Sequence, residues 1–160
     1  MIKNISNLGD AAVYCDFGKE VNKEINTNVI KYFYSIRNQK IKGINNLTPS
    51  YNKLIISFDL KLTNFNEIKK KIENLNINEV FIQNNKELKI PVCCDEIFGL
   101  DISILEKKLS IKKDKILENF FNKEYFCYMT GFIAGMPFLG DLNKNMHTKR
   151  LETPRVTVPK

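Results

Sequence analysis

The chain has 160 residues, of which 43% are hydrophobic and 27% charged, so it can bury a core and wholesale disorder is excluded. No apolar run approaches the length of a membrane span, and residues 1–7 lack the apolar core of a secretory signal, which predicts a cytoplasmic protein without a membrane partner. The net charge of +7 comes from lysines scattered among asparagine and glutamate. This pattern is typical of a solvated surface, so no nucleic-acid partner is expected.

The first half of the sequence predicts alternating strands and helices. Strands are expected at 11–17, 43–48, 53–59 and 80–82. Residues 20–37 carry apolar side chains three or four positions apart, which predicts a helix with one apolar stripe. Asn64 with Glu67 fits the capping box of a second helix. The order β-α-β-β-α-β indicates an N-terminal ferredoxin-like α/β domain at 1–85.

The pattern changes from residue 86, where a second domain, 86–160, is expected to begin. Further strands are expected at 87–93, at 125–129 and at 153–159, the second of them apolar enough to be buried on both faces. Two short helices lie between the first two strands, capped by Asp101 and near Ser110. The mixed charge of the second helix favours a packing role over DNA reading.

The cysteines and the histidine do not predict a metal site. The four cysteines have no CxxC spacing, and the only close pair, Cys93 and Cys94, is vicinal. Cys15 and Cys127 lie in apolar runs, where a reduced cysteine packs as a small hydrophobe. The single histidine, His147, has mostly polar neighbours and is interpreted as an exposed loop residue.

The segment Thr130–Leu142 combines three glycines, a proline and large apolar side chains directly after an expected strand. Glycine permits positive φ or a close approach of other groups, and surface loops are usually polar. The loop is therefore expected to be buried or to line a pocket.

Several groups of short motifs follow one another along the chain. They are Gly9-Asp10-Ala11-Ala12 with Phe17-Gly18, then Pro49-Ser50-Tyr51 with Leu54 and Phe58-Asp59, then Ile90-Pro91-Val92-Cys93 with Phe98-Gly99-x-Asp101, and finally Gly131-Phe132-x-x-Gly135-x-Pro137-Phe138-Leu139-Gly140 with Thr153-Pro154-Arg155 and Val158-Pro159. In this order they resemble the carboxyltransferase-type family that includes a 5-oxoprolinase subunit, allophanate hydrolase subunit 1 and the sporulation histidine-kinase inhibitor.

The resemblance implies an α+β fold in which the ferredoxin-like domain precedes an incomplete cyclophilin-like β-barrel with two short helices inserted. It implies a hydrolase subunit of a multi-subunit ATP-dependent 5-oxoprolinase, which opens 5-oxoproline to glutamate and is inactive alone. The implied partner is a second barrel subunit, with room for a third subunit. The same pair of barrels resembles the carboxyltransferase domain of urea-processing enzymes. Because the sequence has no P-loop, ATP is expected to bind at the level of the complex.

The sequence departs from the family pattern at several positions. Ala134, Met136 and Phe138 stand where Pro, Phe and Tyr are usual, and Lys149 and Leu151 replace Pro and Arg. The family continues with further strands beyond the last residue of this chain. Three interpretations stay open: a truncated barrel, a barrel completed by another chain, and an inactive fragment.

Opening a lactam requires charge stabilisation at its carbonyl, for which backbone N–H groups of glycine-rich turns are suited, whereas the arginine fork binds carboxylate or phosphate. The predicted substrate-binding residues are Phe132, Gly135, Pro137, Phe138, Gly140, Arg150 and Arg155. No catalytic residue is assigned. The residues alone also fit glycines that only form turns and an Arg155 paired with a local carboxylate such as Glu152. A non-catalytic binding module resembling the kinase inhibitor is the alternative function.

Overall fold

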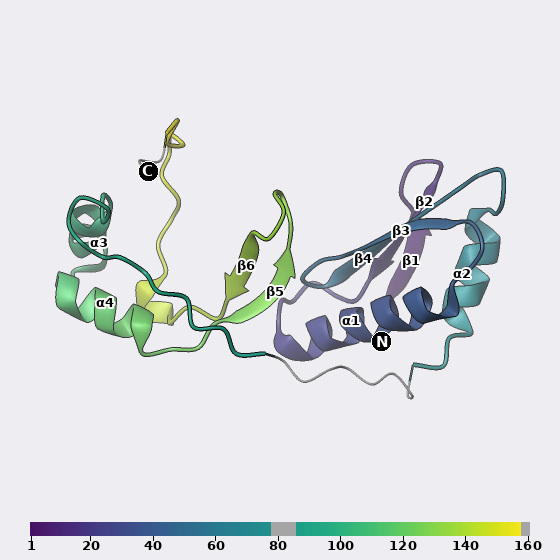
Figure 1. Cartoon of the computed structure of the whole chain (residues 1–160), viewed down its shortest axis with the longest axis horizontal. Coiled ribbons are helices and arrows are strands. Elements are labelled where there is room, and N and C mark those ends of the chain that lie inside the picture. Colours follow the sequence, from purple (N-terminus) through teal and green to yellow (C-terminus); the bar gives the residue numbers. More distant parts are fainter. Residues whose placement is uncertain (78–85, 158–160) are drawn as a thin grey trace. The chain divides into compact units, whose positions relative to one another are not determined.

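The computed structural model describes residues 1–77 and 86–157 (Figure 1). Its internal contacts divide the chain into two compact units. The first unit comprises Met1–Asn85 with Cys127–Leu139, and the second comprises Lys86–Phe126 with Gly140–Lys160. Because the segment 127–139 is grouped with the first unit, the sequence-based domain limits of 1–85 and 86–160 stay a prediction. The chain is a mixed helix-and-sheet protein, as expected.

A four-stranded antiparallel sheet forms the frame of the first unit. Its strands are β1 (Asn4–Asn7), β2 (Ala12–Asp16), β3 (Ile44–Pro49) and β4 (Lys53–Phe58), in the spatial order β1-β2-β4-β3. Buried residues alternate along β2 and β4, because only one face of the sheet is covered. Pro49 extends β3 one residue beyond the prediction, and β3 is an edge strand, where proline is tolerated.

The strand β1 was not predicted from the sequence. Its residues, Asn-Ile-Ser-Asn, contain a single β-branched apolar side chain, so the local signal for a strand is weak. Pairing with β2 supplies the order, since Ile5 lies opposite Cys15 in the sheet. The strand expected at 80–82 lies outside the described residues.

Two helices, α1 (Lys23–Gln39) and α2 (Phe65–Glu73), cover one face of the sheet (Figure 1). The capping box of α2 is confirmed: the Asn64 side chain accepts the Glu67 N–H at 3.1 Å, and the Glu67 carboxylate accepts from Asn64 Nδ2 at 2.9 Å. Helix α1 begins three residues later than predicted, because Asn22 is its cap and accepts the Ile25 N–H at 2.9 Å.

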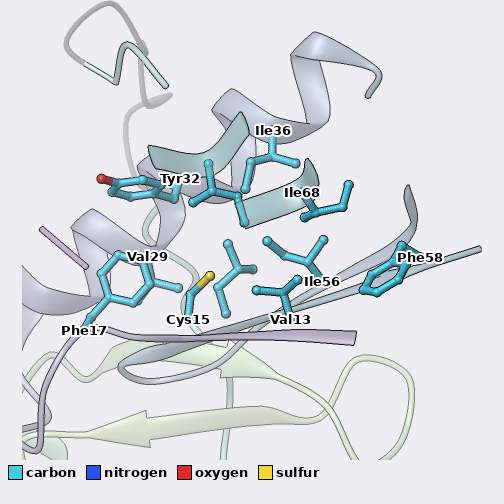
Figure 2. Close-up of a cluster of buried hydrophobic side chains, with 11 residues drawn as sticks. Val13, Cys15, Phe17, Val29, Tyr32, Ile36, Ile56, Phe58 and Ile68 are labelled. Atoms are coloured by element: carbon cyan, nitrogen blue, oxygen red, sulfur yellow. The ribbon is translucent and has the colours of Figure 1, made fainter. Parts of the chain in front are cut away.

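The core of the first unit lies between this sheet and these helices. Figure 2 shows side chains of the helices directed at side chains of the strands. The sheet contributes Val13, Cys15, Leu54 and Ile56, and the helices contribute Val29, Ile36, Ile68 and Ile72, all with at most 1% of their surface exposed. The regular spacing in the sequence produces this core, since every third or fourth residue of a helix meets every second residue of a strand.

Cys15 is expected to resist alkylation in the folded protein, unlike exposed Cys127. Burial raises the pKa of the Cys15 thiol from 9.0 to about 12, and only the thiolate reacts readily. Because the unfolded thiol ionises at the lower pH, stability from this group is complete below pH 9 and declines as the pH rises toward 12. Mass spectrometry of iodoacetamide-treated protein at about pH 8 measures both sites, and equal rates would contradict the buried position.

All four cysteines are unpaired. The predicted burial is confirmed for Cys15 but wrong for Cys127, whose side chain is exposed. Cys127 lies in strand β5 (Phe126–Thr130), which pairs with β6 (Pro137–Gly140). The expectation that this strand is buried on both faces is also wrong, because only Tyr128 of its residues is buried. The two-stranded sheet leaves one face of β5 to solvent.

The remaining elements are α3 (Ile102–Leu109), α4 (Lys113–Phe121) and the short 3₁₀ helix η1 (Lys144–Met146). The two predicted short helices are confirmed, but their predicted caps are wrong. Asp101 makes no capping hydrogen bond, and Ser110 ends α3 in the left-handed conformation instead of starting α4. The Glu106 carboxylate accepts the Lys113 N–H at 2.6 Å and so takes over the capping of α4.

Two further strand predictions are wrong for the described residues. Residues 87–93 have irregular backbone, as do 153–157 of the segment expected to form the last strand. Both segments alternate apolar and polar residues, but that pattern specifies a strand only when a neighbouring strand accepts its hydrogen bonds.

Candidate functional site

The glycine-rich segment connects β5 to β6 as a tight loop, Gly131–Met136, which we call the tip loop. The Gly131 N–H donates to the Met136 carbonyl at 3.1 Å, and the Met136 N–H donates to the Ile133 carbonyl at 3.2 Å. Phe132 has φ 67° and Gly135 has φ 79°, both left-handed. Glycine adopts this conformation without cost, whereas a bulky aromatic residue there is strained.

The tip loop is exposed, which corrects the expectation of a buried loop. Phe132 has 92% of its surface accessible and Ile133 has 62%. Pro137 is exposed as well, at the start of β6. Consecutive exposed apolar residues on a strained turn are typical of a contact surface.

The base of the β5–β6 hairpin packs on the first unit through aromatic rings. The Tyr51 ring lies with its centroid 5.8 Å from that of Tyr128 and 6.2 Å from that of Phe138. Phe138, a predicted site residue, is half-buried and contributes to the support of the hairpin. The Ser50 hydroxyl donates to the Met129 sulfur at 3.4 Å. Ser50 and Tyr51 belong to a motif found in the sequence, but only the structure shows what they contact.

A buried asparagine adds polar bonds at the same place. Asn26, on α1, is 2% exposed, and its Nδ2 donates toward the carbonyl oxygens of Ser50, Tyr51 and Tyr128 at 3.2, 3.0 and 3.0 Å. Sequence reasoning missed this residue. The available signal was its place beside Ile25 and before Val29, on the apolar side of the helix.

In the second unit, Arg155 forms a bidentate ion pair with Asp101. The two guanidinium nitrogens Nη1 and Nη2 lie 3.1 and 2.6 Å from the carboxylate oxygens. The hydrogen bond from Arg155 lowers the pKa of Asp101, and the pair correspondingly raises the pKa of Arg155. The alternative pairing of Arg155 with Glu152 is therefore wrong.

This ion pair lies at the edge of a pocket of about 280 Å³, whose apolar lining consists of Phe98, Leu100, Ile102 and Leu105. Two motifs recognised separately in the sequence, Phe98-Gly99-x-Asp101 and Thr153-Pro154-Arg155, meet here. Apolar walls beside a fixed guanidinium can hold a small organic anion.

The other predicted site residues lie outside this pocket. Arg150 is exposed in the segment after η1. Gly140 ends β6 with an ordinary negative φ, while the next residue, Asp141, has φ 68°. His147 is exposed as expected, and its Nε2 lies 3.0 Å from the Leu142 carbonyl oxygen.

Over the described ranges 1–77 and 86–157, no three His, Cys, Asp or Glu side chains are grouped so that they could hold a metal ion. Within the same ranges, the helices are all too short or too polar to cross a membrane. The cytoplasmic location stays a prediction.

A mixed fold with an antiparallel sheet and a glycine-rich hairpin agrees with one known class. The family model described as carboxyltransferase domain, subdomain C and D, matches residues 3–160, and the chain belongs to this family. The resemblance found in the sequence is thereby confirmed. The chain is 29% identical to a 5-oxoprolinase subunit of Bacillus subtilis (strain 168), covering 97% of this chain and 70% of that protein. It is 26% identical to the Haemophilus influenzae protein of the same name, covering 98% and 72%.

Solved structures support the fold. The protein TTHA0988 superposes with a TM-score of 0.80 at 21% identity, over 94% of this chain and 29% of that one. The urea carboxylase of Kluyveromyces lactis superposes with a TM-score of 0.61 at 13% identity, over 79% of this chain and 13% of that one. The chain thus spans less than a third of either solved chain, and at these identities the likeness concerns the fold alone.

Proposed function

We propose that this protein is a subunit of a multi-subunit, ATP-dependent 5-oxoprolinase that opens 5-oxoproline to glutamate together with a second barrel subunit. The observation that carries the proposal is the alignment of two relatives named as a 5-oxoprolinase subunit with 97% and 98% of this chain. The finer fold description belongs to the same proposal: a ferredoxin-like α/β domain followed by part of a cyclophilin-like barrel.

The tip loop is the proposed contact surface for the second subunit. Its exposed Phe132 and Ile133 offer apolar surface that association would remove from water. Gly135 is the proposed donor of a backbone N–H to the developing charge on the lactam carbonyl, a role suited to a glycine-rich turn. Gly140 and Arg150 stay predicted contributors.

Arg155 is the proposed ligand of a carboxylate or phosphate group. Asp101 occupies one edge of its guanidinium, at 2.6 and 3.1 Å, and arginine retains further N–H donors for a second anion. Phosphorylation of the amide oxygen by ATP would supply the activation, with nucleotide bound by the assembled complex.

Co-expression with the subunits encoded beside this chain is expected to yield glutamate only when both ATP and 5-oxoproline are present. Gly135→Val is expected to lower the rate about tenfold or more, because a β-branched residue disfavours φ 79° and displaces a proposed donor. Arg155→Ala is expected to act similarly by removing an anion ligand. Coupled detection of glutamate measures the rates.

Two control variants match these substitutions. Gly9 also has positive φ and open space around it, so Gly9→Val tests strain away from the hairpin. Arg37→Ala removes an arginine of α1 that lies over the Phe33 ring. Activity unchanged in both Gly135→Val and Arg155→Ala would reject the site assignment. Absence of glutamate formation by the complete wild-type complex would reject the function.

The exposure of Phe132 also favours a second candidate, a non-catalytic module that docks on a helical partner as the histidine-kinase inhibitor would. A pull-down with this chain distinguishes the two. Recovery of a histidine kinase without a barrel subunit supports the binding module, whereas recovery of the barrel subunit supports the enzyme.

A further inference from the structure

Asn26 connects three parts of the first unit, a role that its sequence position does not reveal. Its amide nitrogen lies within 3.2 Å of three backbone carbonyl oxygens, although an amide has only two hydrogens to donate. Ser50 and Tyr51 lie between β3 and β4, and Tyr128 lies in β5, 102 residues along the chain from Asn26. One side chain therefore joins a helix, a turn and the hairpin.

These hydrogen bonds determine orientation as well as proximity. The aromatic contacts of Tyr51 with Tyr128 and Phe138 hold the hairpin in place by apolar burial, which depends little on direction. A hydrogen bond weakens steeply when its angle changes, and a buried polar group that loses its partner is costly. The bond to Tyr128 therefore opposes sliding of β5 against α1.

We propose that Asn26 is a positioning residue, which holds the β5–β6 hairpin on α1 and so fixes the direction in which the tip loop is presented. The inference rests on the proposed function only for its consequence, that a misplaced tip loop binds the second subunit less well. The positioning itself is a property of this chain alone.

Hydrogen exchange on the full chain tests the positioning. In Asn26→Ala, amides of residues 127–139 are expected to exchange about tenfold faster, while those of β2 and β4 change less than about twofold. Asn26→Asp keeps the shape of the side chain but loses the donor when ionised, so it is expected to loosen the hairpin at least as much. Asn26→Ser retains one hydroxyl donor and is expected to give a smaller acceleration; it replaces the alanine variant if that variant is incompletely folded.

Asn52 provides the matched control. It is also a buried asparagine of the first unit, 9% exposed, and its Nδ2 donates to the carbonyls of Gly18 and Glu20 at 2.9 and 3.0 Å. Asn52→Ala removes a comparable set of bonds away from the hairpin. The proposal is overturned if both alanine variants accelerate exchange in 127–139 equally, or if no Asn26 variant does.

The assembled complex gives a readout that general destabilisation would not produce. In Asn26→Ala, the concentration of second subunit needed for half-maximal glutamate formation is expected to rise about tenfold, with the rate at saturation within about twofold of wild type. A lower saturating rate with an unchanged half-maximal concentration would overturn this consequence. If the wild-type complex makes no glutamate, the proposed function fails while the exchange result still decides the role of Asn26.

Discussion

Replacing Ile56 by alanine is expected to lower the free energy of unfolding of the first unit by about 3 to 4 kcal/mol. Ile56 is fully buried in β4, between Val13 on one neighbouring strand and Leu47 on the other. Truncation removes its apolar surface from the core and leaves a cavity that neighbours on two paired strands cannot readily fill.

Urea denaturation followed by circular dichroism measures the change, and exchange of the β2 and β4 amides assigns it to the first unit. Ile133→Ala is the matched control, since the same atoms are removed from a side chain that is 62% exposed. Its expected effect is below about 0.5 kcal/mol. A loss below about 1 kcal/mol for Ile56→Ala would contradict the packing of this core.

Replacing Gly43 by alanine is expected to cost about 2 to 3 kcal/mol. Gly43 precedes β3 with φ 91°, a conformation that disfavours any side chain. An added Cβ would lie 2.7 Å from Thr63 Cγ2 and 3.3 Å from Leu62 Cβ. Thr63 cannot easily move away, because it is buried and its hydroxyl donates to the Glu67 carboxylate at 2.9 Å.

The same urea titration measures this variant. Gly9→Ala separates strain from collision, since Gly9 has φ 61° but nothing within 4 Å of an added Cβ. The expected cost at Gly9 is about 1 kcal/mol, from backbone strain alone. Equal costs at the two glycines would show that Thr63 moves aside and that the close approach contributes nothing.

The elements of the first unit were largely predictable because their signals are local. The capping box at Asn64 and the alternation along β4 each depend on residues a few positions apart, and the structure confirms both. The failures have a common cause as well. Strand β1 and the irregular segment 87–93 differ less in their sequence pattern than in whether a partner strand lies beside them.

The candidate site divides along the same line. Its glycine-rich loop was recognisable because positive φ at Gly135 and the ordered motifs leave a direct trace in the sequence. The exposure of that loop was mispredicted, since apolar composition states only that contact with water is unfavourable, and not which surface removes it. The partner of Arg155 was mispredicted because sequence proximity favoured Glu152 over Asp101, which lies 54 residues away.

Neighbouring residues were enough to establish the family, the helices of the first unit and the segment that forms the tip loop, because periodicity, capping and ordered motifs are encoded locally. The bond from Asn26 to Tyr128 and the pairing of Asp101 with Arg155 became visible only in the folded chain. Each of these contacts joins residues far apart in the sequence. The energy of a hydrogen bond or ion pair depends on the distance and direction between its groups, and folding alone sets both.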